Sequence, residues 1–205
     1  MTGDFKIVFT GGPCGGKSTL LPKVEKYLKE KEFNVVHVEE APTWMHRNGI
    51  LDEKLDSYLR ERAIFKTRLE FEQSAVSSQG EGPKIILLDR GLFDGQAYCT
   101  GSEWCQICKY FRLKPSNLWD RYDLVIHLPS IAHHNPQAYL DLKDQNPARK
   151  ESIKEAIVTD RKLTWAWAAH PNYHIIGDED LNVRLFHILQ RIDVSLVQQN
   201  QKVLV

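Results

Sequence analysis

The stretch FKIVFTGGPCGGKST, residues 5–19, decides the fold. It opens with an apolar run typical of a buried strand and continues into the pattern G-x-x-x-x-G-K-[ST]. Leu20, Leu21, Val24 and Leu28 then fall on one stripe of a predicted helix. A strand before this pattern and a helix after it are the context in which it marks a phosphate-binding loop, or P-loop.

The loop is expected to wrap the phosphates of ATP or GTP. Its glycines let the backbone curl so that N–H groups point at phosphate oxygens, and the helix adds the positive end of its dipole. Lys17 is expected to contact the β and γ phosphates, and the Ser18 hydroxyl to hold Mg²⁺. The predicted nucleotide-binding residues are Gly11, Gly12, Pro13, Cys14, Gly15, Gly16, Lys17, Ser18 and Thr19. The alternative is a glycine-rich turn that carries a Lys-Ser pair by chance.

Short apolar runs alternate with longer helical patterns along the whole chain. Four further runs lie at residues 35–38, 85–88, 124–128 and 173–176, and their apolar character suits strands covered on both faces. Residues 51–78 are predicted to form one or two long helices, and residues 181–199 a terminal one. This alternation predicts a doubly wound α/β fold. With no linker or repeat, residues 1–205 are predicted to form a single domain.

Acidic residues follow two of the predicted strands, at the sheet edge where ligands bind in open parallel sheets. Asp89 is expected to bind Mg²⁺ directly or through water, with Arg90 facing phosphate or substrate. Glu40 is the candidate to accept a proton from an attacking hydroxyl. The alternative for Glu40 is a loop cap or a salt bridge.

The polar segment 129–153 is predicted to be a flap, or lid, over the site, with an inert surface loop as the alternative. Phosphoryl transfer needs positive charge over the migrating group, often from a closing loop. Arg149, at the end of this segment, is the first candidate, and Arg161, on a predicted helix that follows, is the second.

The global charge excludes recruitment of a polyanion by bulk attraction, because Lys plus Arg and Asp plus Glu both number 27. No secretory leader or apolar run of membrane-spanning length is present, which predicts a cytoplasmic protein with no membrane span. Cys105 and Cys108, with Cys99 nearby, suggest zinc only superficially, because a structural zinc site needs four ligands.

Four blocks of sequence carry a resemblance to a known family: TGGPCGGKST, VEEAPT, LLDRGLFDGQAY and EAIVTDRKLTWAWAAHP. Through them the chain resembles the P-loop family that groups TRPL translocation defect proteins with the kinase domain of NadR. The resemblance covers nearly the whole chain and extends to deoxynucleoside and nucleotide kinases. It implies a three-layer α/β/α fold with a five-stranded parallel sheet and a lid. It also implies that Glu40 acts on the acceptor hydroxyl, and that Asp89 and Arg90 serve Mg²⁺ and the phosphates.

These observations favour a kinase that uses Mg²⁺ and ATP to phosphorylate a small nucleoside-like acceptor. A regulatory protein that binds GTP or ATP, hydrolyses it slowly and has no acceptor is the first alternative. A polynucleotide 5′-kinase is the second, and it would need a basic groove that the zero net charge disfavours. The sequence contains no N-K-x-D guanine signature, so specificity of the small-GTPase type has no support. The acceptor pocket is expected to be bordered by Arg60, Arg62 and Arg68.

Overall fold

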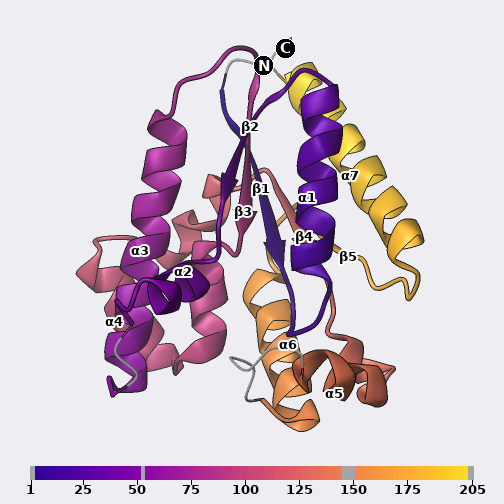
Figure 1. The fold of residues 1–205 in the computed structure, drawn as a ribbon. Helices are drawn as coiled ribbons and strands as arrows, with labels where there is room; N and C mark the ends of the chain where they lie inside the picture. The colour runs from indigo at the N-terminus through magenta and orange to yellow at the C-terminus, as the bar shows by residue number, and fades with distance from the viewer. Residues whose placement is uncertain (1–2, 52–53, 145–150, 203–205) are drawn as a thin grey trace.

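The five apolar runs form one parallel sheet in the computed structural model, which describes residues 3–51, 54–144 and 151–202 (Figure 1). Its strand order is β2-β3-β1-β4-β5, so the chain crosses from one side of β1 to the other, as in a doubly wound fold. The strands are β1 (Phe5–Thr10), β2 (Asn34–Val38), β3 (Lys84–Asp89), β4 (Leu124–His127) and β5 (Tyr173–Ile175). The predicted fold class and strand number are confirmed.

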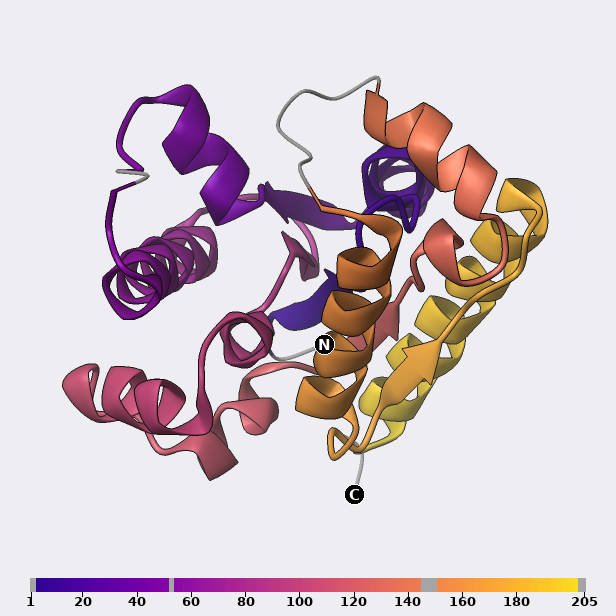
Figure 2. The same cartoon turned by 90° about the horizontal axis from the view of Figure 1, so that it is seen from below.

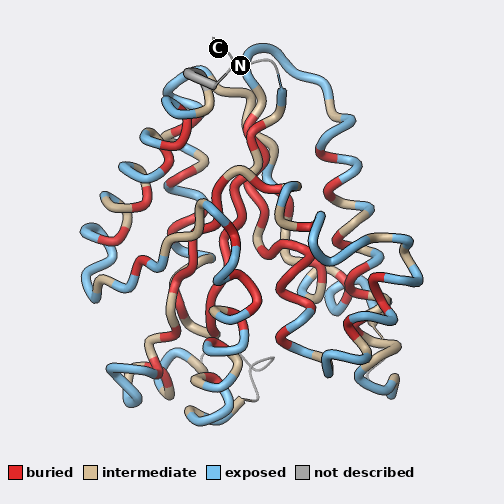
Figure 3. The backbone as a smooth tube through the Cα atoms, turned by 180° about the vertical axis from the view of Figure 1, so that it is seen from behind, coloured by how far each residue is buried: buried red, intermediate tan, exposed pale blue. Residues whose placement is uncertain are grey.

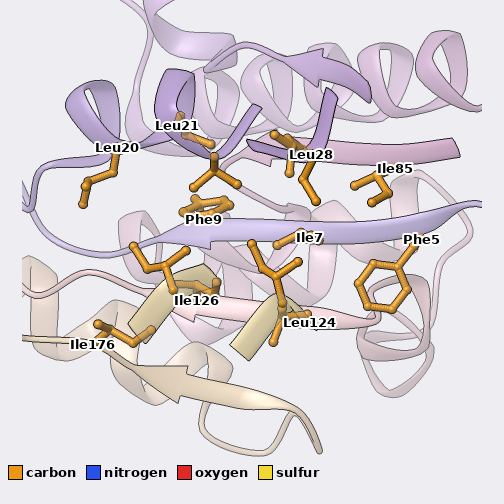
Figure 4. Packing of buried hydrophobic residues seen from close by; sticks show 14 of the residues in the cluster. Phe5, Ile7, Phe9, Leu20, Leu21, Leu28, Ile85, Leu124, Ile126 and Ile176 are labelled. Atoms are coloured by element: carbon orange, nitrogen blue, oxygen red, sulfur yellow. The ribbon is translucent and has the colours of Figure 1, made fainter. Parts of the chain in front are cut away.

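Helices cover both faces of the sheet and complete three layers. On one face, α1 (Lys17–Glu30) packs on buried residues of β1, β3 and β4 (Figure 4). The helix α7 (Leu181–Lys202) packs on the same cluster. The other face is covered by α3 (Ser57–Ser77), η1 (Leu92–Tyr98), α4 (Gly101–Tyr110) and α6 (Ile153–Trp167). The remaining elements are α2 (Ala41–Arg47), η2 (Pro115–Asn117), η3 (Trp119–Arg121), η4 (Ile131–His133) and α5 (Pro136–Asp144).

The central strands are the most buried part of the chain (Figure 3). The two edge strands differ from the prediction, because they are not covered on both faces. Every residue of β4 is buried, but β2 has one buried residue of five and β5 has none. The apolar sequences of β2 and β5 therefore predict correctly that both are strands of the sheet. They do not predict solvent exposure, which depends on the position of these strands at the edges of the sheet.

The carboxyl ends of the central strands meet at one edge, where the P-loop lies. The parallel register pairs Phe9 with Asp89 and Thr10 with His127. Seen from below, α2 and α3 lie on one side of these strand ends, and α5 and α6 lie on the other (Figure 2). Residues that follow the strands can therefore converge on the P-loop from two sides.

The first part of segment 129–153, residues 129–144, contains regular structure, since it forms η4 and α5. Tyr139 is fully buried in a cluster with Ala132 and Ala156, and Cys14 of the P-loop packs against that cluster. The sequence prediction missed this anchoring because a few apolar residues are scattered among polar ones. The assignment of the segment as a lid stays a prediction.

Candidate active site at the strand ends

The P-loop depends on glycine because its backbone touches the strand beside it. A Cβ on Gly11 would lie 2.0 Å from the carbonyl oxygen of Leu128, and one on Gly15 would lie 2.3 Å from the same atom. Gly11 and Gly16 also have φ values of 123° and 91°, which disfavour any residue with a side chain. The loop therefore closes tightly on the end of β4, and α1 begins directly after it at Lys17.

Lys17 reaches back over the loop. Its Nζ donates to the carbonyl oxygens of Gly11 and Gly12, at 3.2 and 3.5 Å. Burial and the nearby positive charge of Arg90 lower the pKa of Lys17 to about 8, although Asp89 and Glu40 oppose that shift. An incoming phosphate would supply stronger acceptors than the two carbonyls.

Nucleotide affinity should therefore fall in mildly alkaline solution. Protonated Lys17 is the form that attracts phosphate, and the ligand-free protein loses this proton as the pH rises through about 8. Linkage then predicts a Kd for the Mg²⁺–nucleotide complex roughly tenfold higher at pH 9 than at pH 7, with proton uptake on binding at pH 9. Isothermal titration calorimetry in two buffers of different ionisation enthalpy measures both quantities. An equal Kd at both pH values without proton uptake would contradict this role of Lys17.

Glu40 lies two residues beyond β2 and is held as a carboxylate. Arg90 Nε donates to its Oε1 at 3.0 Å, and the Thr43 hydroxyl donates to its Oε2 at 2.6 Å. Burial opposes ionisation, but the charges of Arg90 and Lys17 and these hydrogen bonds lower the pKa of Glu40 to about 2. The structure thus brings Glu40 near Lys17, and its carboxylate is charged throughout the physiological pH range.

Asp89 ends β3 with an unused oxygen. Its Oδ1 is buried and has no hydrogen-bond partner among the described residues. Burial raises the pKa of Asp89, and the negative charge of Glu40 adds to that effect against the charge of Lys17. A buried carboxylate oxygen without a protein partner fits a site for a hard cation or its bound water.

Arg90 bridges two acids and is itself buried, at 7% exposure. Besides Glu40, it donates from Nη1 to Asp94 Oδ1 at 3.0 Å, and its backbone adopts a φ of 82°. Burial opposes the charge of Arg90, but electrostatic interactions with Tyr98, Asp94 and Glu40 outweigh it and raise the pKa of Arg90, so it stays charged. The guanidinium therefore orients Glu40, and the predicted contact of Arg90 with phosphate stays a prediction.

Asp94 is the site residue that the sequence prediction missed. It is fully buried in η1 and accepts hydrogen bonds from the Thr10 hydroxyl, the Gly91 backbone and the Trp167 indole as well as from Arg90. Those partners come from β1, from the turn after β3 and from α6. The spacing in DRGLFDG, an acid four residues after an arginine at a strand end, was the available signal.

The structure does not test the two cations predicted to face the phosphates. Arg149 lies outside the described residues. Arg161 is exposed on α6, while its neighbour Asp160 is buried against Gly12. Ser18 and Thr19 lie exposed in the first turn of α1. The roles of these residues stay predictions.

The α3 arginines are used in different ways. Arg68 is buried and donates to Glu61 at 2.8 Å, and a Cβ on Gly95 of η1 would lie 2.7 Å from Glu61 Oε1. Burial raises the pKa of Glu61 to about 6. Arg60 donates to a backbone carbonyl in its own segment, and Arg62 lies over the rings of two tyrosines. Of the three, only Arg68 belongs to the buried polar region beside η1.

The cysteines give no support for zinc. Cys99 donates to the carbonyl of Gly95, Cys105 is exposed and Cys108 is buried in α4. In the ranges that the structure describes, no group of three or more His, Cys, Asp or Glu side chains is arranged to hold a metal. Within the same ranges, none of the helices has the length and apolar character needed to cross a bilayer.

Comparisons with known proteins identify the family and the fold. A family model described as an AAA domain matches residues 6–184. A thymidylate kinase from Caldicellulosiruptor saccharolyticus is 33% identical over 104 residues. That match covers 48% of this chain and 50% of the thymidylate kinase, so the chain aligns with about half of that relative.

Three solved structures share the fold at low sequence identity. NadR in complex with NAD and AMP-PNP has a TM-score of 0.64 and 18% identity, and the match covers 92% of this chain and 48% of NadR. Thymidylate kinase from Ehrlichia chaffeensis has a TM-score of 0.63 and 15% identity, over 93% of this chain and 99% of that one. Deoxyadenosine kinase from M. mycoides with bound dATP has a TM-score of 0.62 and 12% identity, over 92% and 100%.

Proposed function

Since the chain belongs to this AAA-domain family, and its P-loop adjoins an ionised acid that follows β2, we propose that it is an ATP-dependent kinase for a small nucleoside-like acceptor. The observation that carries the proposal is the convergence of Lys17, Glu40 and Asp89 at one edge of the sheet. A protein that only binds phosphate needs the first of these groups. Transfer to a hydroxyl needs a proton acceptor as well.

Each group has a role in this reaction. The P-loop amides and Lys17 bind the phosphates, and Lys17 stabilises negative charge at the β and γ groups. Glu40 accepts a hydrogen bond from the acceptor hydroxyl and orients it toward the γ-phosphate. As the new P–O bond forms, Glu40 takes up the hydroxyl proton, the bond between the γ phosphorus and the β–γ bridging oxygen breaks, and ADP leaves with that oxygen. Arg90 holds the Glu40 carboxylate in place through its Nε.

Mg²⁺ suits the residues present. The buried Asp89 Oδ1 without a hydrogen-bond partner in the described structure, and the Ser18 hydroxyl at the start of α1, would hold the ion directly or through water. Bound there, Mg²⁺ would neutralise charge on the β and γ phosphates.

We place the acceptor beside α2, α3 and η1. Glu40 leads into α2, and the buried Glu61–Arg68 pair lies against η1. A nucleoside or nucleoside monophosphate has hydroxyl groups and a polar base that such side chains can recognise. The names of the matched relatives, thymidylate kinase and deoxyadenosine kinase, agree with this class. The four cysteines form no disulfide, which fits the cytoplasm as the proposed compartment.

An acceptor screen tests the proposal. Thermal-shift measurements with Mg²⁺ and ATP, GTP, nucleosides and nucleoside monophosphates identify ligands, because a ligand that binds the folded state raises its stability. ADP release is then measured with each hit. The proposal expects release that depends on one acceptor class. Tight triphosphate binding with slow hydrolysis that no acceptor accelerates would instead support a regulatory nucleotide-binding protein.

A further inference from the structure

A buried carboxylate outside the proposed chemistry joins three elements beside the P-loop. Asp160 of α6 is 3% exposed. Its Oδ1 lies 3.0 Å from Nε2 of His127, the last residue of β4, and its Oδ2 lies 2.7 Å from Nε2 of His133 in η4. His127 is fully buried, and His133 is 30% exposed. A charge placed this deep needs partners on both oxygens, and it has them.

The same carboxylate lies against the backbone of the P-loop. A Cβ added to Gly12 would come within 2.6 Å of Asp160 Oδ1 and 2.7 Å of Ser130 Cβ. Ser130 in turn donates to the carbonyl oxygen of Pro13 at 2.6 Å. Gly12 and Pro13 are thus backed by side chains from α6 and from the turn that follows β4.

The hydrogen-bond roles in this cluster follow from its acceptor. An ionised carboxylate only accepts, so both imidazoles donate from Nε2. Nδ1 of His127 is buried without a hydrogen-bond partner among the described residues, so a second proton there would bury an unpaired donor. Burial disfavours ionisation of Asp160, but the hydrogen bonds from His127 and His133 lower its pKa, and it stays charged.

We propose that Asp160 is a positioning residue for the P-loop. Held by His127 and His133, its carboxylate fixes the backbone at Gly12 in the conformation that receives the phosphates. It touches neither the phosphates nor the acceptor. The expected effect of Asp160 on nucleotide affinity rests on the proposed nucleotide binding. Its expected effect on the P-loop backbone does not, because that effect is a property of the ligand-free protein.

Two substitutions at Asp160 compare loss of the side chain with its replacement by one of the same size. Asp160→Ala removes the carboxylate that packs against the Gly12 backbone and leaves the imidazoles of His127 and His133 without their acceptor. Asp160→Asn keeps the shape, since its amide oxygen accepts from His127 and its NH₂ donates to His133 once the proton of that half-exposed ring moves to Nδ1. Both are measured at pH 8, where an ordinary imidazole is neutral.

Glu72→Gln is the matched control. Glu72 is also a buried carboxylate, at 2% exposure, and accepts hydrogen bonds from Tyr122 and Arg121. It belongs to α3, and within the described residues its carboxylate makes no hydrogen bond or ion pair with the P-loop. Its substitution reports the general effect of disturbing a buried acid.

Hydrogen exchange of the P-loop amides in ligand-free protein and calorimetric titration with Mg²⁺–ATP are the two readouts. We expect Asp160→Ala to speed exchange in residues 11–16 by about tenfold and to raise the Kd about tenfold. Asp160→Asn should stay within about threefold of wild type in both, and Glu72→Gln should change neither. Unchanged exchange in Asp160→Ala, an asparagine variant as impaired as alanine, or an equal effect of Glu72→Gln would each overturn the proposal. Because exchange needs no ligand and calorimetry no acceptor, these outcomes are independent of whether phosphoryl transfer occurs.

Discussion

Glu40→Gln should lower acceptor-dependent phosphoryl transfer by about 10²-fold or more, because a positioned base contributes that much to such reactions. Glutamine keeps the size of the side chain and an oxygen for Arg90 Nε, but it cannot take the proton of the acceptor. The Kd for Mg²⁺–nucleotide should stay nearly unchanged, since Lys17 and the loop amides are intact. Single-turnover transfer rates and calorimetric Kd values measure the two effects separately.

Glu39→Gln is the control for that experiment. Glu39 precedes Glu40 in the chain, but it is 44% exposed and pairs with Arg47 at the surface. Its substitution should leave transfer within about threefold of wild type, because exposed ion pairs contribute little. Full transfer activity in Glu40→Gln would show that Glu40 is not the base, and a large loss of nucleotide affinity would show that it acts in binding instead.

Asp94→Ala should reduce the free energy of unfolding by about 3–5 kcal/mol, as expected when one partner of a buried ion pair is removed. The change leaves the Arg90 guanidinium, the Thr10 hydroxyl and the Trp167 indole without an acceptor that they now share. Arg90 keeps its bond to Glu40, which favours the lower end of that range. Denaturant unfolding monitored by circular dichroism gives the value.

The matched surface substitution is Asp193→Ala. Asp193 also accepts from two side chains, Tyr27 and Lys31, but it is 40% exposed. It should cost no more than about 1 kcal/mol. If both variants lose the same small amount of unfolding free energy, Asp94 does not organise the site as the structure indicates.

The strands and the P-loop could be predicted because each has a local cause. Runs such as residues 85–88 are apolar at every position, which few structures other than a buried strand accommodate. Gly11 and Gly16 occupy positive-φ positions that few other residues tolerate, so the loop pattern is itself a geometric constraint. The family resemblance, drawn from such blocks, is confirmed by the AAA-domain match.

The charge network around the loop could not be predicted in the same way. Asp94 gains its importance from Thr10 and Trp167, which are 84 and 73 residues away in the chain. Asp160 directly precedes Arg161 in the sequence, but its burial against Gly12 depends on how α6 packs on the sheet. Sequence spacing places such residues on an element, but tertiary packing decides which of them is buried.

Calorimetric titration of Mg²⁺–ATP and Mg²⁺–GTP into the wild-type protein, Lys17→Ala and Lys23→Ala tests the central claim most directly. Lys23 lies exposed on the same helix and serves as the control. The account predicts that the wild type and Lys23→Ala bind at least one of the two nucleotides with the same Kd. Lys17→Ala should bind it about tenfold more weakly or worse, because a charge-assisted contact to phosphate is lost. Binding of neither nucleotide by the wild type, or equal affinity in all three proteins, would contradict it.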